Sequence, residues 1–237
     1  MANVAWFSGG VSSAVAIKLA INEIDEIYYI HIDDQHGDTI RFIKDCEKWF
    51  RKKVVIMQSK YHNVNDTLLA SQYVNGVHGA PCTKILKKRV RKTWERNNRD
   101  RDITYYWGMD STEGKRADRI IDGMHKFNHV FPLIDKRIGK KEAHEILNAS
   151  GIKRPKMYDL GYYNNNCIGC VKGGQGYWNK IREDFPEVFK LRSEMERIIG
   201  ASCIKGIFLD ELKEDQGRKQ KPIVDDCGIF CQIQAIE

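Results

Sequence analysis

The sequence predicts an α/β protein with a doubly wound, mostly parallel five-stranded sheet and a C-terminal helical, cysteine-rich appendage. Across residues 1–135, short apolar runs alternate with segments of helical periodicity, which is typical of parallel strands joined by crossover helices. From residue 136 the alternation stops and cysteine pairs stand in aperiodic segments. We therefore expect an α/β domain over residues 1–135 and an appendage over residues 136–237 that packs on it.

Each expected element follows from its hydrophobic periodicity and from the turn-forming residues at its ends. The expected strands are 3–7, 27–32, 54–57, 103–107 and 130–133. The expected helices are 12–21, 39–50, 83–94, 113–125, 140–149, 177–182 and 188–199, while 66–73 fits either type.

The composition indicates a globular protein that does not span a membrane. The chain has 237 residues, of which 42% are hydrophobic and 30% charged, as in a globular protein. Neither a membrane-spanning run nor a secretory leader is visible, so we expect a cytoplasmic location. In that compartment the seven cysteines indicate metal or redox chemistry more than disulfides.

The stretch Ser8-Gly9-Gly10-Val11-Ser12-Ser13 lies between the first strand and the first helix. Glycines there let the backbone turn tightly, and the free amides of a helix N-terminus attract anions. The pattern predicts a phosphate site, with an ordinary strand–helix turn as the alternative. Asp33, Asp34 and Gly108 follow other strands, and the carboxyl ends of parallel strands share one edge.

The segment 84–92 concentrates positive charge on one expected helix, which buries Leu86, Val90 and Trp94. Its basic face indicates either a solvated surface or contact with a phosphate-rich ligand or a nucleic acid.

The cysteines fall into two kinds. Cys167 and Cys170 have the spacing of a chelating loop, Cys227 and Cys231 offer a second pair, and Cys82 precedes the basic helix. Zinc and an iron–sulfur cluster both fit four thiolates. Cys46 and Cys203 are expected to be buried as small apolar side chains.

With these motifs in place, the chain resembles the PP-loop ATP pyrophosphatases, and within them the phosphoadenosine and adenosine phosphosulfate reductases. The loop at 8–13 is similar to the family's Ser-Gly-Gly-x-Asp-Ser, and 31–34 resembles its acidic strand end. The segments 81–87 and 108–116 resemble its cysteine–Leu–Lys helix and its Gly-x-x-x-x-Glu-x-x-Arg motif.

The resemblance implies an adenine nucleotide hydrolase-like fold that binds ATP or another adenine nucleotide. The residues expected to bind it are Ser8, Gly9, Gly10, Val11, Ser12, Ser13, Asp33, Asp34, Gly108 and Lys115. A [4Fe-4S] cluster, or zinc, is expected on Cys82, Cys167, Cys170 and Cys231. The expected catalytic residues are Cys227, Ser12, Lys84 and Arg116.

The implied activity is sulfur transfer or reduction, as an oxidoreductase or transferase, on an adenylated substrate or a nucleic acid. Two departures from the family pattern stand out: Ser12 replaces an aspartate, and Cys82 is single where the reductases have two adjacent cysteines. The alternative is a non-catalytic nucleotide- or nucleic-acid-binding module with structural zinc. A third hypothesis is a redox sensor with a degenerate nucleotide site.

Overall fold

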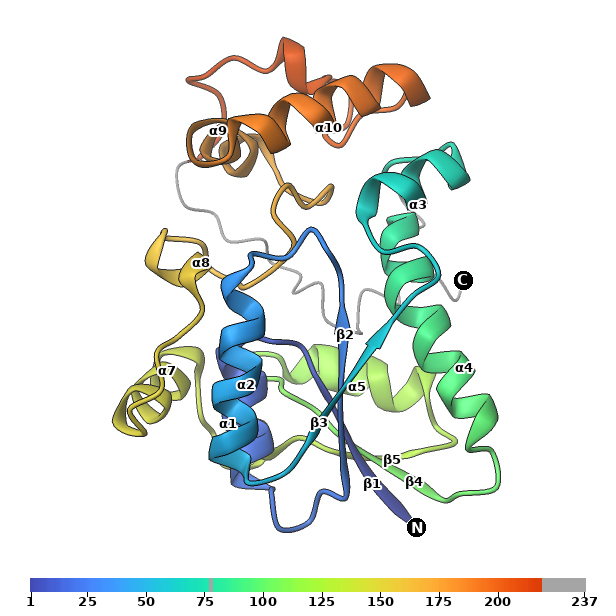
Figure 1. The fold of residues 1–237 in the computed structure, drawn as a ribbon, viewed down its shortest axis with the longest axis vertical. Helices are drawn as coiled ribbons and strands as arrows, with labels where there is room; N and C mark the ends of the chain where they lie inside the picture. Colours follow the sequence, from blue (N-terminus) through green and yellow to red (C-terminus); the bar gives the residue numbers. More distant parts are fainter. Residues whose placement is uncertain (77–78, 219–237) are drawn as a thin grey trace.

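The computed structural model describes residues 1–76 and 79–218, and its centre is a five-stranded sheet (Figure 1). All pairings are parallel, in the order β3-β2-β1-β4-β5. The strands are β1 (Ala2–Phe7), β2 (Glu26–His31), β3 (Val54–Gln58), β4 (Ile103–Tyr106) and β5 (Asn128–Val130). The predicted fold class is confirmed.

Helices cover both faces of the sheet, because alternate strand side chains point to opposite sides. On one face, Ala5 and Phe7 of β1 share an apolar cluster with α1 (Val11–Leu19), α2 (Asp38–Phe50) and α7 (Lys140–Ala149). On the other face, Val4 and Trp6 pack in a second cluster with side chains of α4 (Arg89–Asn97) and α5 (Gly114–Gly123). Burial on both faces explains why the central strands β1 and β4 read as continuous apolar runs.

The expected fifth strand is misplaced by a few residues. The strand ends at Val130, and Pro132 starts the short helix α6 (Pro132–Asp135). Proline has a fixed φ and no amide hydrogen, so it suits the first turn of a helix better than a strand interior.

Two helical segments also differ from expectation. The single helix expected at 83–94 is a π-helical segment, η1 (Thr83–Lys88), that runs directly into α4. The ambiguous segment 66–73 is α3 (Val64–Ser71), which starts where the Asn63 side chain accepts a hydrogen bond from the Asp66 amide.

A third apolar cluster contains residues from the middle of the chain and from the C-terminal part that the structure describes. The C-terminal region forms α8 (Lys156–Asp159), α9 (Gln175–Asp184), α10 (Pro186–Ile199) and η2 (Leu209–Glu211). α9 and α10 lie together at the top of Figure 1. Side chains from these elements and from α3 and η1 make up the cluster, among them Leu68, Leu86, Trp178, Ile181 and Leu209. The boundary predicted at residue 135 remains a prediction, and this cluster contains residues from both sides of it.

None of the helices in residues 1–76 and 79–218 has the length and apolarity needed to cross a membrane.

Candidate functional site

The Ser-Gly-Gly loop lies at the carboxyl edge of the sheet, between β1 and α1. Gly9 adopts a φ of +79°, a left-handed conformation that favours glycine, and Gly10 is extended and caps α1. Two serine side chains hold the turn: Ser13 Oγ accepts from the Ser8 amide at 3.0 Å, and Ser8 Oγ accepts from the Gly10 amide at 3.3 Å. The loop is therefore built before any ligand arrives.

Some amide groups of this loop donate hydrogen bonds within the structure, and others, which we call open amides, have no acceptor among the described residues. The Val11 amide donates to the Tyr158 hydroxyl at 3.3 Å. The amides of Gly9, Ser12 and Ser13 have no acceptor among the described residues. Open amides at a helix N-terminus form an anion site, favoured further by the helix dipole.

Two segments that are distant from the loop in sequence contact it. A Cβ on Gly108 would lie 2.4 Å from Ser13 Cα, so the segment after β4 touches α1 at a point where only glycine fits. From the C-terminal region, Asn165 Nδ2 donates to the Gly9 carbonyl at 2.8 Å. The predicted grouping of the loop with Gly108 is present, and Asn165 joins it.

The two expected acids have different surroundings. The side chain of Asp33 is half exposed, 3.6 Å from His31 Nε2, and accepts a hydrogen bond from Gln58. Asp34 is nearly buried, accepts from the Val64 amide at 2.7 Å and lies 3.4 Å from Arg192 Nη2. Burial raises the pKa of Asp34 above its usual value, although Arg192 opposes the shift. Of this pair, Asp33 is the carboxylate open to solvent.

The expected cationic residues lie on two elements. Lys84 is exposed on η1, and Lys115 is exposed in the first turn of α5. Beside Lys115, Arg116 Nη1 is 2.6 Å from Glu113 Oε1. On η1, partial burial and the nearby cations Lys92, Arg91 and Lys84 lower the pKa of Lys88. Arg91 does not join the basic face, because it is buried against Glu95.

Cys82, Cys167 and Cys203 lie in or against the third apolar cluster, Cys170 lies beside Cys167, and Cys46 lies apart from them in α2. The Cys170 amide donates to the Tyr177 hydroxyl at 2.9 Å, and that hydroxyl donates to the Cys167 carbonyl at 3.3 Å. Burial, with Cys170 as the next cause, raises the pKa of Tyr177. Cys203 is buried, and its pKa is raised by burial, by Glu196 and, more weakly, by Cys82. Cys46 is buried in α2, as expected.

The metal site expected on Cys82, Cys167, Cys170 and Cys231 does not assemble from the described cysteines. Within residues 1–76 and 79–218, no three His, Cys, Asp or Glu side chains gather as a metal-binding group. Cys227 and Cys231 lie outside the described residues. The three cysteines that are described thus do not by themselves fit iron–sulfur or zinc, and the site remains a prediction.

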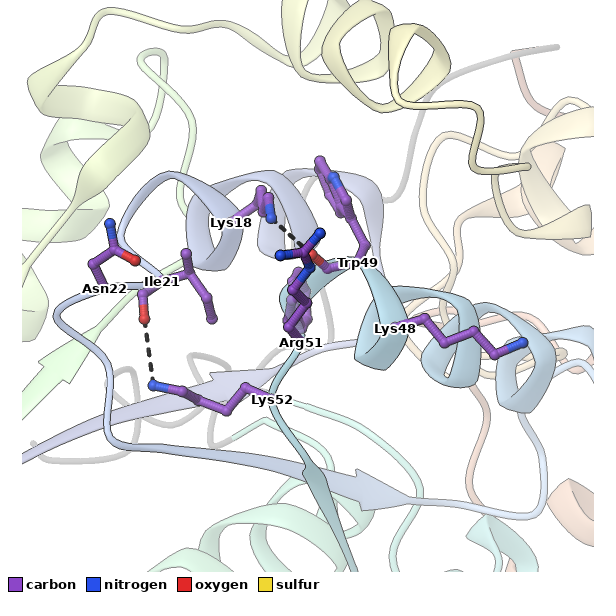
Figure 2. A pocket seen from close by; sticks show the side chains of 8 residues that line it. Lys18, Ile21, Asn22, Lys48, Trp49, Arg51 and Lys52 are labelled. Carbon is purple, nitrogen blue, oxygen red and sulfur yellow. Dashed lines mark hydrogen bonds between the residues drawn. The ribbon is translucent and has the colours of Figure 1, made fainter.

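A basic pocket lies at the opposite end of α1 and α2 from the Ser-Gly-Gly loop (Figure 2). It has a volume of about 700 Å³ and is lined by Lys18, Ile21, Asn22, Lys48, Trp49, Phe50, Arg51 and Lys52. Lys18 donates to the Trp49 carbonyl at 2.7 Å and Lys52 to the carbonyls of Ile21 and Ile24. Two of its cations therefore bind helix-end carbonyls, which accounts for their position without a ligand.

A larger pocket, which we call the α7–α9 pocket, has a volume of about 1030 Å³. Its lining side chains come from α7, α8, α9, the segments that join them and the segment after η2, and include Lys140, Lys141, His144, Arg154, Tyr158, Tyr162, Tyr163, Asn164, Tyr177, Asn179, Lys180, Glu183, Glu214 and Asp215. Most of these residues were not among the expected site residues. Half of them lie in α7 and α9 and the others mostly in aperiodic segments, and no sequence pattern indicated that these segments meet.

Fold and loop together define an α/β protein with a loop of open amide groups at the carboxyl edge of a parallel sheet. The sequence-family model of the phosphoadenosine phosphosulfate reductase domain matches residues 2–176 of the chain. The chain therefore belongs to this family, which is part of the PP-loop superfamily. The structure of NMN synthetase from Francisella tularensis is similar over 84% of this chain and 86% of that chain, with 12% identity and a TM-score of 0.42. No curated protein matches the chain.

Proposed function

We propose that the chain is a PP-loop enzyme that binds an adenine nucleotide at the N-terminus of α1. The observation that carries the proposal is the set of open amides of Gly9, Ser12 and Ser13 in a loop already held in shape. Such preformed donors stabilise phosphate charge without reorganisation, both in the bound nucleotide and in a transition state. Asp33, exposed at the neighbouring strand end, would orient the ribose or a metal ion.

The chemistry we propose for this nucleotide is activation of a second substrate for sulfur transfer or reduction. Family membership and the Cys167–Cys170 loop support it. Exposed Lys84 and Lys115, together with Arg116, would neutralise charge on the phosphates, and Cys227 would act on sulfur. Iron and zinc analysis of protein purified without oxygen tests the metal. Iron at a cluster stoichiometry supports reduction, and zinc alone overturns the cluster.

Calorimetric titration with ATP tests the nucleotide site. In Gly10→Val, a side chain enters the loop near the Tyr158 hydroxyl, which lies 3.2 Å from the position of a Cβ. The φ of Gly10 is −102°, which valine also adopts, so the fold is expected to survive. ATP affinity should fall at least about tenfold, which corresponds to about 1.4 kcal/mol.

Gly174→Val is the matched control for this experiment. Gly174 caps α9 in the same extended conformation, and no atom lies within 4 Å of the position that a Cβ would take. This variant should bind ATP as the unmodified protein does. Equal ATP affinity in Gly10→Val and the unmodified protein would overturn the assignment of the nucleotide to this loop.

A second candidate function is nucleic-acid binding by the basic face of η1 and α4. Lys84, Lys92 and Arg96 are exposed at intervals of four or eight residues, and Lys88 lies between them. Crowded like charges destabilise a helix unless an anion neutralises them. The pKa of Lys88 is lowered first by its partial burial and then by the neighbouring cations Lys92, Arg91 and Lys84. Binding of single-stranded oligonucleotides should weaken steeply with salt, and Lys92→Glu should weaken it further. Absence of salt-sensitive binding would favour the solvated-face alternative.

A further inference from the structure

The α7–α9 pocket adjoins the nucleotide loop through one side chain. Tyr158 lines the pocket, and its hydroxyl accepts the hydrogen bond from the Val11 amide, the first amide of α1. The Tyr158 ring also packs edge-on against His144, with ring centres 4.7 Å apart. A ligand in the pocket and a phosphate in the loop would therefore lie on two sides of the same tyrosine.

The walls of the pocket carry both cationic and anionic side chains. Lys140, Lys141 and His144 line it from α7. Burial, then Lys140, lowers the pKa of His144 to about 4, so the lysines carry the positive charge there at neutral pH. Glu183 of α9 and the segment with Glu214 and Asp215 line it with carboxylates, while Lys180 of α9, which also lines it, is paired with Asp184 at 2.9 Å. Such a pocket suits a ligand with an anionic group at one end and hydrogen-bond donors at the other.

Aromatic rings also line the pocket. Tyr163 is 50% exposed, and Lys140 Nζ lies 3.6 Å from the centre of its ring. Tyr162 and Tyr177 lie edge to face, 5.9 Å between ring centres. The carboxylate-bearing segment is held in place by Asn179, whose amide nitrogen donates to the carbonyls of Lys213, Glu214 and Gln216. The pocket is thus preformed and presents aromatic side chains for a planar ligand.

We propose that the α7–α9 pocket binds the second substrate, and that this substrate is a nucleotide, either free or at the end of a nucleic-acid strand. Its phosphate would face Lys140 and Lys141, its base would stack on Tyr163, and an exocyclic amine would face Glu183, Glu214 or Asp215. The volume of about 1030 Å³ accommodates a nucleotide. The proposal rests on the proposed function, because the adenine nucleotide in the loop is what would act on this substrate.

The test is calorimetry with CMP, GMP, UMP and a 5′-phosphorylated single-stranded decamer, each titrated into protein already saturated with ATP. CMP and GMP carry an exocyclic amine and should bind at least about fivefold more tightly than UMP, as one hydrogen bond to a carboxylate predicts. Tyr163→Ala and Lys141→Glu should each weaken binding at least about fivefold. Lys190→Glu, at an exposed lysine of α10 that does not line the pocket, should leave binding unchanged.

Each outcome decides the proposal. If only the decamer binds, and if Tyr163→Ala and Lys141→Glu weaken its binding at least about fivefold, the substrate is the end of a nucleic-acid strand. No binding of any probe, equal binding in the pocket variants, or displacement of CMP and GMP by ATP overturns it. If ATP fails to bind while the probes bind with these losses, the proposed function fails and the pocket assignment stands.

Discussion

Arg192 in α10 lies 3.4 Å from Asp34, which follows β2, although 158 residues separate them. Both side chains are largely buried, and Arg192 is only 2% exposed. Its Nε and Nη1 atoms have no partner among the described residues. The ion pair with Asp34 therefore offsets part of the desolvation of this guanidinium, and it joins the C-terminal helices to the sheet edge that carries the Ser-Gly-Gly loop.

Arg192→Met should reduce the free energy of unfolding by about 3–5 kcal/mol near pH 8, because it leaves the Asp34 carboxylate buried without its partner. The loss should be smaller near pH 5. The folded-state pKa of Asp34 is raised, so the folded protein binds a proton there more readily than the unfolded chain, and ionisation of Asp34 costs stability as pH rises. Urea unfolding at the two pH values measures both effects.

The double variant Asp34→Asn/Arg192→Met should recover most of that loss, since neither charge remains buried. Arg197→Met is the control on the same helix: Arg197 is paired with Asp210 and Glu211 at the surface. This change should cost about 1 kcal/mol or less. A loss in Arg192→Met no larger than in Arg197→Met would contradict a compensated buried charge.

Gly108→Ala should destabilise the protein by about 1–3 kcal/mol and weaken ATP binding. The new Cβ would lie 2.4 Å from Ser13 Cα, a backbone atom that cannot move without displacing the first turn of α1. Gly114→Ala, where nothing lies within 4 Å of the new Cβ, should raise stability by up to about 1 kcal/mol. Thermal unfolding and ATP titration of both variants check the pair.

Histidine titration should show that His144 stays neutral well into the acidic range. Burial, followed by Lys140 and Arg154, lowers its pKa from 6.5 to about 4. Because the unfolded chain takes up the proton first, His144 should make stability fall as pH drops from about 6.5 to about 4. Urea unfolding of His144→Gln should show a flatter dependence in this window, and NMR titration of the ring reports the pKa directly. A ring that titrates near 6.5 would refute the prediction.

Tyr158→Phe should cost about 0.5–1.5 kcal/mol of stability, because the Val11 amide loses its acceptor while the ring packing remains. Tyr163→Phe is a suitable control, since the Tyr163 ring is half exposed. Urea unfolding compares the two variants. Equal stability of Tyr158→Phe and the unmodified protein would show that water replaces the tyrosine at the loop.

Much of the fold was predictable, because parallel strands buried on both faces leave a strong apolar signal. The run 3–7 and the Ser-Gly-Gly turn identify β1 and the start of α1 almost residue by residue. Gly108 was predictable as part of the same edge because it follows an expected strand of a parallel sheet, whose strands share one carboxyl edge. The start of α6 was missed because Val130 and Phe131 prolong the apolar run up to Pro132.

The rest of the site depends on contacts between distant segments, which local patterns do not report. Asp34 looks equivalent to Asp33 in sequence, and contacts with Val64 and with Arg192 of α10 distinguish it in the structure. Tyr158 and Asn165 reach the loop from a region with little periodicity. The π-helical turn of η1 has no distinct pattern, because it uses the same apolar and basic residues as a regular helix.

The apolar cluster shared by α3, η1 and the C-terminal helices has a consequence for synthesis on the ribosome. Leu68 and Leu86 emerge early, whereas Trp178, Ile181 and Leu209, which bury them, are translated about a hundred residues later. At about 5–20 residues per second, that interval lasts roughly five to twenty seconds. During this time the nascent chain exposes an apolar surface beside a nearly complete sheet, which is the stage at which a chaperone would bind it.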